Sequence, residues 1–530
     1  MPLARRRRGR YASEVPRPLP AGAVRVPLQR WTPLPAAAAA VAADGGAVAG
    51  VAGRRFPRRR QLAERLAARN RELGNDVEGP LADWLTGAEV VVSGQQPGLL
   101  GGPLLTLVKA CAVAATVQEL RAAGNPAVGF LWLATGDDDL PEMGWGRVAV
   151  DGRLVIAREQ QWRRGMALGG AAILGTACHD LLNQVAEVKL GEHGRAAVEL
   201  ARSCYRPGRT LGDATAAFLG QLLAGSGVVL VDACEEEVAR SAADAVDAVL
   251  GNLPAVWTAL ADGEATMRSR GFTPVLRVTP ARLPVFRRVG DRRERLLSEA
   301  GACPVLVRRE HAAQPARFLP NAWLRPLVQD AALDTGVAVL GGAELAYHLQ
   351  TAPAREVLGM ARPQWRLRPH LTVATAAERR LAAQLGVSLD DLLHQRLPRR
   401  LVARRRLHAQ LERLGTLVEG RLGRLAADAA AGLPAARGDV EATRARLRAS
   451  LAWLDERLAA AAARSAEVVA ARWEKLRAFL RPDGEPQERA LSVLAPLLRL
   501  GPEWPSRLAQ VIPVDDPGMA VLFWGEGGAW

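Results

Sequence analysis

The sequence predicts an α/β fold around a parallel sheet, followed by a helical arm, from three observations. Apolar runs without alternation, such as Val90–Val92, Ala127–Ala134 and Gly227–Ala233, are typical of strands that are covered on both faces. The run at Val90–Val92 continues through a glycine-rich turn into an apolar helical pattern, and the same order recurs after Val337–Leu340. Two leucine stripes at near-heptad spacing follow residue 402 and predict a helical hairpin.

The composition is that of a globular protein, with 49% hydrophobic and 24% charged residues, and 530 residues can form two to four domains. The net charge is +15, and the basic residues are 67 arginines and three lysines. The sequence has no aromatic RNA-binding signature, zinc-finger spacing or basic recognition helix. We therefore expect no nucleic-acid partner, and a polyanionic substrate explains the charge equally well.

Neither a disulfide framework nor a membrane span is expected. The five cysteines are scattered and form no C-x-x-C pair, which favours a reducing, cytoplasmic location. The N-terminal region has no continuous apolar segment of the signal-peptide type, and the alanine-rich run at 36–53 is too polar to span a bilayer.

Composition and pattern divide the chain into four regions. Residues 1–55 predict a flexible N-terminal arm, and residues 56–395 predict the α/β core, with an α+β insertion at about 252–316. Residues 396–480 predict the helical arm, and residues 481–530 predict a segment that returns to the core.

Outside the motifs, the core patterns predict helices at 62–73, 81–85 and 234–250, a mostly helical stretch at 165–225, and strands at 154–159 and Met519–Trp524. The last of these is expected at the edge of a sheet. In the insertion, alternation predicts strands at Phe272–Val278, Leu283–Val289 and Cys303–Val307, with a hairpin turn at Gly290-Asp291.

The helical arm is expected to be a two-helix antiparallel coiled coil. Gly432-Leu433-Pro434 interrupts the leucine pattern and predicts the turn between the helices. An exposed seam along such a hairpin would suit self-association. The alternative is a hairpin that packs flat on the core.

The most informative stretch is Ser93–Pro103, which follows the first strand. It contains four glycines and two prolines and leads into the helix that carries Lys109. A strand, a glycine-rich turn and a helix can direct backbone N–H groups and a helix N-terminus at an anion. Lysine is rare in this chain, and a compact ammonium near the turn suits a phosphate or carboxylate. The alternative is a packing turn with a surface lysine.

An acidic stretch, Thr135–Glu142, follows the next strand and includes Asp137, Asp138 and Asp139. In open α/β sheets, ligands bind beyond the carboxyl ends of the strands. Clustered carboxylates there could hold Mg²⁺ beside phosphates, bind an amino group, or act as acid and base. The alternative is a solvated turn that caps a helix.

A second constellation runs from Leu319 to Tyr347. Arg325 and Gln329 are four residues apart and share a helix face, so they could hold one ligand together. Gly341-Gly342 and Glu344 follow an apolar strand and repeat the strand–glycine–helix order. The alternatives are that Arg325 pairs with Asp330 and that Glu344 only stabilises its helix start.

Because a doubly wound sheet gathers strand ends at one edge, we expect these motifs to share one cleft. The residues expected to line it are Gln95, Gln96, Lys109, Asp137, Asp139, Asn321, Arg325 and Glu344. A lone ammonium contributes little to folding, so Lys109→Ala is expected to cost activity far more than stability.

These motifs together resemble those of the bacillithiol biosynthesis cysteine-adding enzymes, the BshC family. The resemblance lies in Ser93–Leu99 with Gly101-Gly102-Pro103 and Lys109, Trp132 with Asp137–Asp139, Asn321–Asp330, Gly341–Tyr347, and Pro482-Asp483-Gly484 with Gln487-Glu488-Arg489. The motifs occur in the family's order and extend from about Phe56 to Leu500.

The resemblance implies a Rossmann-like core related to class I aminoacyl-tRNA synthetases and a coiled coil that forms homodimers. It also implies a ligase that joins the carboxyl of cysteine to the amine of glucosaminyl-malate, with ATP and Mg²⁺ for activation. Lys109, Asp137 and Asp139 are then expected to be catalytic, and no residue is assigned to a metal. The residues expected to bind substrate or nucleotide are Gly94, Gln95, Gln96, Gly98, Gly101, Gly102, Asn321, Arg325, Gln329, Gly341, Gly342, Glu344 and Tyr347.

The chain departs from the family pattern at three places. Ser93 replaces threonine, and the acidic loop contains Gly136-Asp137-Asp138-Asp139 where the family usually has Glu-Asp-His-Asp. His370 stands where the family usually has arginine. Two alternatives therefore stay open: a divergent member that ligates another amino acid, and a non-catalytic nucleotide-binding or scaffold protein.

Overall fold

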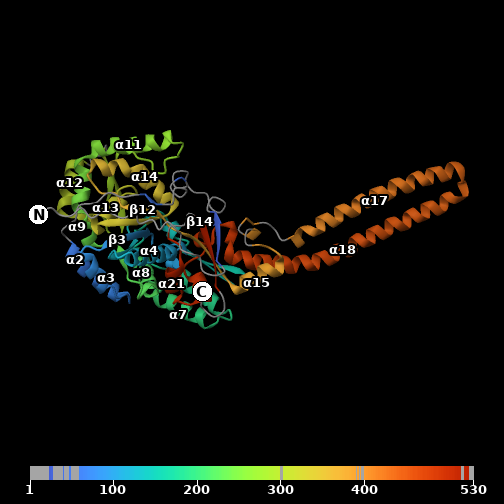
Figure 1. The fold of residues 1–530 in the computed structure, drawn as a ribbon, viewed down its shortest axis with the longest axis horizontal. Helices are drawn as coiled ribbons and strands as arrows, with labels where there is room; N and C mark the ends of the chain where they lie inside the picture. The colour runs from blue at the N-terminus through green and yellow to red at the C-terminus, as the bar shows by residue number, and fades with distance from the viewer. Residues whose placement is uncertain are drawn as a thin grey trace. The chain divides into compact units, whose positions relative to one another are not determined.

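The computed structural model describes residues 23–27, 40, 47–48, 59–298, 303–388, 391–392, 394–395, 399–514 and 518–524 (Figure 1). The chain divides into two compact units. The core unit comprises Met1–Val150, Leu154–Val373 and Glu485–Trp530, and the arm unit comprises Asp151–Arg153 and Ala374–Gly484. In the described part of the chain, no helix is both long and apolar enough to cross a bilayer.

The core unit is built on a six-stranded sheet with the order β2-β12-β11-β3-β4-β7. Its strands are β2 Ala47–Val48, β12 Gln364–Leu367, β11 Thr335–Leu340, β3 Glu89–Gln95, β4 Ala127–Leu133 and β7 Val228–Asp232. The strands from β12 to β7 pair in parallel, and β2 pairs antiparallel with β12. The predicted α/β class with a parallel sheet is therefore confirmed, and Val90–Val92 lies in a central strand as expected.

Helices of the core unit connect and cover these strands. They are α2 Arg59–Glu72, α3 Glu78–Leu85, α4 Leu105–Ala122, α5 Leu140–Met143, α6 Ala177–Ala186, α7 Glu192–Cys204, α8 Leu211–Leu223, α9 Glu236–Ser241, α10 Ala243–Gly251, α11 Leu253–Ser269, α12 Pro304–Ala313, α13 Arg325–Leu333, α14 Gly342–Val357, α19 Gln487–Ala490, α20 Leu494–Leu500 and α21 Trp504–Val511. The helix expected at 234–250 is divided into α9 and α10 at Ala242.

Close packing fixes α4 and α3 on opposite faces of the sheet. A Cβ at Gly129 of β4 would lie only 2.7 Å from Val113 Cγ1 of α4, so only glycine allows this approach. The next residue, Phe130, packs edge-on against Trp84 of α3 at 5.2 Å between ring centroids. Since consecutive strand residues point to opposite faces, the two helices cover different faces of β4.

The strand order reverses beside β3, and this reversal positions the site. The chain runs from β3 through β4 to β7 on one side, and later enters β11 and β12 on the other side of β3. Ligands of open α/β sheets bind at such a reversal, beyond the carboxyl ends of the strands. Helix α4 follows β3 and helix α14 follows β11, so both helices begin at this point.

The insertion at 252–316 is α+β, as expected, but two of its expected strands are absent. Strand β8 Arg282–Val289 pairs with β9 Arg292–Leu297 and with β10 Phe318–Pro320. The predicted strand at Phe272–Val278 is wrong, because this segment is irregular. The predicted strand at Cys303–Val307 is also wrong, because helix α12 begins at Pro304. Helix α11 packs along α14 (Figure 1), where a Cβ at Gly263 would lie 2.0 Å from Gln350 O.

Two smaller sheets complete the core unit. Strand β5 Trp145–Val150 pairs with β6 Arg153–Arg158, and a second sheet has the order β1-β14-β13. Strand β14 Gly518–Trp524 lies between β1 Val24–Pro27 and β13 His370–Thr375. The strand was predicted correctly, but the prediction that it lies at the edge of a sheet is wrong, because it is the central strand of this one. The described residues of 1–55 include strands β1 and β2, and most of the predicted flexible arm lies outside the described residues.

The arm unit contains the predicted antiparallel helical hairpin. Its helices are α15 Ala376–Leu385, α17 Arg399–Gly432 and α18 Arg437–Leu480, with a short turn at Pro434–Ala436 between the last two. Glu419 of α17 forms ion pairs with Arg444 and Arg448 of α18, at 2.7 and 2.9 Å. These cross-helix pairs fix the register of the hairpin.

A buried ionic cluster ties the C-terminal segment of the core unit to β12 and β13. Glu488 is fully buried, and its carboxylate accepts hydrogen bonds from Arg368 at 2.8 and 3.0 Å and from Leu371 N–H at 3.0 Å. His370 Nδ1 lies 2.8 Å from Glu488 Oε1. Burial would raise the pKa of Glu488, but Arg368 and His370 outweigh it and hold the pKa well below its ordinary value.

Glu488→Gln is expected to lower the free energy of unfolding by about 3 kcal/mol at pH 7, because it leaves Arg368 buried without a counter-charge. The carboxylate stabilises the fold above the ordinary carboxyl pKa, and this contribution is lost as the pH falls toward the lower folded-state pKa. The difference in free energy of unfolding between wild type and variant should therefore become smaller below about pH 4, as urea unfolding curves at several pH values would show. The exposed Glu485→Gln is the control, and an equal loss there would contradict the assignment.

Candidate active site

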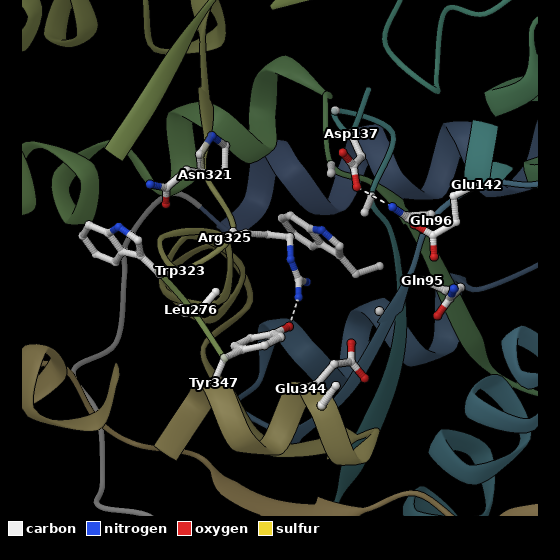
Figure 2. Close-up of a pocket in the computed structure, with 18 of the residues that line it drawn as sticks. Gln95, Gln96, Asp137, Glu142, Leu276, Asn321, Trp323, Arg325, Glu344 and Tyr347 are labelled. Carbon is white, nitrogen blue, oxygen red and sulfur yellow. Dashed lines mark hydrogen bonds between the residues drawn. The ribbon is translucent and has the colours of Figure 1, made fainter. Parts of the chain in front are cut away.

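A cavity of about 680 Å³ lies in the core unit at the strand-order reversal (Figure 2). Gln95 at the end of β3, Trp132 of β4 and Gly341–Ala343 after β11 form one part of its wall. The insertion contributes Leu276 and Phe286. The cavity therefore opens beyond the carboxyl ends of parallel strands, where a ligand site was expected.

Lys109 and Glu344 form a buried ion pair across the reversal. Lys109 Nζ lies 2.8 Å from Glu344 Oε2 and donates to Gly94 O at 2.6 Å and to Gln95 Oε1 at 3.0 Å. These contacts use all three donors of the ammonium, and the lysine side chain is only 4% exposed. Glu344 also accepts the Gly341 N–H at 2.8 Å, so the same carboxylate caps α14 and holds the lysine of α4.

Burial makes this pair important for folding. Burial lowers the pKa of Lys109, although the negative charge of Glu344 acts in the opposite direction and raises it. Burial would raise the pKa of Glu344, but Lys109 and Arg325 outweigh it and hold the pKa below its ordinary value. The premise that Lys109 is a lone ammonium is wrong, because its removal would leave a buried carboxylate without a counter-charge.

Glycines of the turn after β3 serve packing, and the amides of Gly98 and Gly101 donate to other groups of the protein. Gly98 N–H donates to Thr215 Oγ1 at 3.2 Å, and Gly101 N–H donates to Tyr205 Oη at 2.6 Å. A Cβ at Gly101, whose φ is +87°, would lie 2.6 Å from Val493 Cβ. The prediction that this turn directs its amides at an anion is therefore wrong for Gly98 and Gly101.

The acidic loop is held by an arginine from the insertion. Arg293 Nη2 lies 3.0 Å from Asp137 Oδ1 and 2.6 Å from Asp138 Oδ1. Asp137 also accepts a hydrogen bond from Gln96 Nε2, whereas Asp139 pairs with Arg164. Among the described residues, no group of three or more His, Cys, Asp or Glu side chains could hold a metal ion.

Arg325 and Tyr347 form a hydrogen-bonded pair that faces the cavity (Figure 2). Burial raises the pKa of Tyr347 to about 12, so its hydroxyl keeps a proton that it can donate to a ligand. A Cβ at Gly94 would lie 3.3 Å from Arg325 Nη1, so the glycine leaves room for the guanidinium. The alternative pairing of Arg325 with Asp330 is wrong, because Asp330 pairs with Arg355 at 2.6 Å.

The structure brings most of the predicted site residues together. Those that line the cavity are Gly94, Gln95, Gln96, Gly98, Gly102, Lys109, Asp137, Asn321, Arg325, Gly341, Gly342, Glu344 and Tyr347. Gly101, Asp139 and Gln329 are not lining residues. Gln329 is 4% exposed and lies behind Gly94, where a Cβ would be 3.5 Å from its Oε1.

Sequence reasoning missed four prominent residues of the cavity wall: Glu142, Arg293, Trp323 and Arg368. Glu142 ends the acidic stretch, and Trp323 lies within Asn321–Asp330, so both stood inside motifs that had been recognised. Arg293 and Arg368 carry no local signal, since neither belongs to a recognised motif and their partners are distant in the sequence.

Comparison with known proteins decides the family. The family model for the BshC N-terminal Rossmann-like domain of bacillithiol biosynthesis matches residues 47–369. The model for the BshC C-terminal coiled-coil domain matches residues 371–524. The chain belongs to the BshC family. The resemblance seen in its motifs and the Rossmann-like core are thus confirmed.

Curated members of the BshC family are similar to this chain over most of its length. The relative from Solibacter usitatus is 27% identical over 442 residues, which cover 81% of this chain and 83% of the relative. The relative from Koribacter versatilis is 28% identical over 473 residues, which cover 83% of this chain and 84% of the relative. A relative from Thermus thermophilus is 29% identical over 438 residues, which cover 78% of this chain and 84% of the relative. Each is named "Putative cysteine ligase BshC", the enzyme class expected from the sequence.

Lys109→Met is expected to lower the free energy of unfolding by about 3 kcal/mol, because Glu344 is left buried and unpaired. Adding Glu344→Gln should recover part of this loss, as urea unfolding of the single and double variants would show. A double variant no more stable than Lys109→Met would contradict the pair. Lys475→Met removes the exposed ion pair with Asp151 and serves as control, with a change of less than about 1 kcal/mol.

Proposed function

We propose that this chain is a ligase that joins the carboxyl group of cysteine to the amine of glucosaminyl-malate, with ATP as activating co-substrate. The observation that carries the proposal is the presence of opposite charges around one cavity: Arg325, which is hydrogen-bonded to the neutral hydroxyl of Tyr347, against the carboxylate of Glu142. Amide formation requires both, since cations stabilise carboxylate or phosphate oxygens and carboxylates attract an amine. The names of the relatives and the family description support the choice of substrates.

We assign Glu142 as the general base that accepts a proton from the attacking amine. It lies in the first turn of α5, is exposed to the cavity, and has no ion-pair partner among the described residues. Asp137 is less suited, because Arg293 and Gln96 already hold its two oxygens. As the amine nitrogen bonds to the activated carboxyl carbon, the leaving group departs with the C–O electrons and Glu142 accepts the proton that nitrogen loses.

ATP would supply the leaving group on the cysteine carboxylate. The cavity wall includes arginines that have no ion-pair partner among the described residues: Arg277, Arg282, Arg295 and Arg489. Such guanidiniums are available to phosphate oxygens. A magnesium ion does not fit the acidic loop, since Asp137 and Asp138 share Arg293, so we assign any Mg²⁺ to the phosphates of ATP.

We also infer a homodimer formed through the arm unit, in a cytoplasmic protein. Large apolar side chains of the helical hairpin are exposed, including Leu417 at 62% and Trp453 at 61%. Such residues on a coiled-coil surface favour pairing with a second copy. The free thiols of all five cysteines agree with a reducing compartment.

Purified protein incubated with cysteine, glucosaminyl-malate and ATP is expected to form the amide, detected by mass spectrometry. Glu142→Gln should lower kcat at least about 100-fold, the usual size of a general-base effect. Glu199→Gln, an exposed change on α7, is the matched control. Absence of product with wild-type protein would favour the scaffold alternative, and product with serine but not cysteine would indicate a divergent ligase.

Leu417→Asp and Trp453→Asp are expected to convert the dimer to a monomer, because each places a carboxylate in the proposed seam. Light scattering after size-exclusion chromatography measures the mass. Leu433→Asp at the hairpin turn is the control, since this exposed residue lies at the end of the hairpin. A monomeric wild-type protein, or variants that remain dimeric, would contradict the assignment.

A further inference from the structure

The two glutamines of the cavity wall are held in opposite orientations. A glutamine amide carries an acceptor oxygen and a donor nitrogen, and its neighbours decide which end is left for a ligand. Gln95 Oε1 accepts from Lys109 Nζ, which can only donate, so the NH₂ of Gln95 is left to donate. Gln96 Nε2 donates to Asp137 Oδ2, which as a carboxylate only accepts, so Gln96 Oε1 is left as an acceptor.

Arg293 fixes the carboxylate that orients Gln96. Arg293 Nη2 and Asp138 N–H both donate to Asp137 Oδ1, at 3.0 and 2.8 Å, which leaves Oδ2 for Gln96. Arg293 Nη1 also donates to Gly136 O at 2.9 Å, and the guanidinium lies over the Phe286 ring, 4.5 Å from its centroid. With its side chain only 15% exposed, Arg293 is held on several sides.

Asp138 adds a second carboxylate contact to Arg293. Its Oδ1 accepts from the same Arg293 Nη2 at 2.6 Å. A carboxylate is a strong partner for a guanidinium because it is negatively charged. Asp138 thus strengthens the hold of Arg293 on the acidic loop.

The two orientations divide the cavity by polarity. Gln95 presents a donor, and the Arg325 guanidinium lies against the neighbouring Gly94, so this end suits a carboxylate. Gln96 presents an acceptor next to Asp137 and Glu142, as Figure 2 shows, so this end suits an amine. We propose that Arg293 is a positioning residue that, through Asp137, sets Gln96 to accept a hydrogen bond from the substrate amine. This inference rests on the proposed function for the identity of the two substrates.

Calorimetric titration of the full-length protein with glucosaminyl-malate and, separately, with cysteine tests this proposal. Arg293→Gln and Gln96→Met, which removes the acceptor oxygen, are expected to weaken glucosaminyl-malate binding about 10-fold, the effect of one hydrogen bond, and to change cysteine binding less than about 2-fold. Arg293→Lys should bind with intermediate affinity, because a lysine cannot reproduce the guanidinium fork. Arg292→Gln changes the neighbouring exposed arginine of β9 and should bind both ligands as wild type does.

Far-UV circular dichroism and thermal unfolding of each variant distinguish misfolding from lost positioning, and Gln96→Met tests the same contact without changing the insertion. Unchanged affinity for glucosaminyl-malate in Arg293→Gln and Gln96→Met would overturn the inference. So would an equal loss for cysteine, or a wild-type protein that does not bind the amine. Wild-type protein that binds both substrates with the expected variant pattern but forms no amide with ATP would overturn only the ligase proposal.

Discussion

The arrangement of the site depends on the ion pair between Lys109 and Glu344. These residues belong to α4 and α14, the helices that follow the two neighbouring strands β3 and β11 at the reversal of strand order. A buried carboxylate or ammonium alone would be strongly unfavourable, so each requires the other. The pair also holds Gly94 O and Gln95 Oε1, and in this way the ends of two strands and the starts of two helices are joined at one point.

Glycines and charged side chains have separate tasks in this cavity. The turn at Gly98–Gly102 uses its glycines for positive φ angles and close approach, and its Gly98 and Gly101 amides bond within the protein. Charge for a ligand therefore comes from side chains on elements far apart in the sequence, such as Arg325 and Glu142. Such a site can present a cationic end and an anionic end to two substrates at once, which a loop of amides cannot.

The sequence predicted the sheet, the hairpin and most of the cavity wall because these features have local signals. Val90–Val92 is apolar on both faces, and the motifs follow strands. Prediction from the sequence failed where the structure of a segment depends on residues distant in the chain, or where the pattern is too short. Five residues at Cys303–Val307 cannot distinguish a strand from a helix, and Pro304 begins a helix there. Arg293 is 156 residues from Asp137, so only the fold brings its guanidinium onto the acidic loop.

The most direct test of the account is a crystal structure of the protein with glucosaminyl-malate and cysteine bound. We expect both molecules in the cavity between β3 and β11, with the cysteine carboxylate near Gln95 and Arg325 and the sugar amine near Gln96 and Glu142. Substrates bound elsewhere on the protein, with this cavity empty, would contradict it.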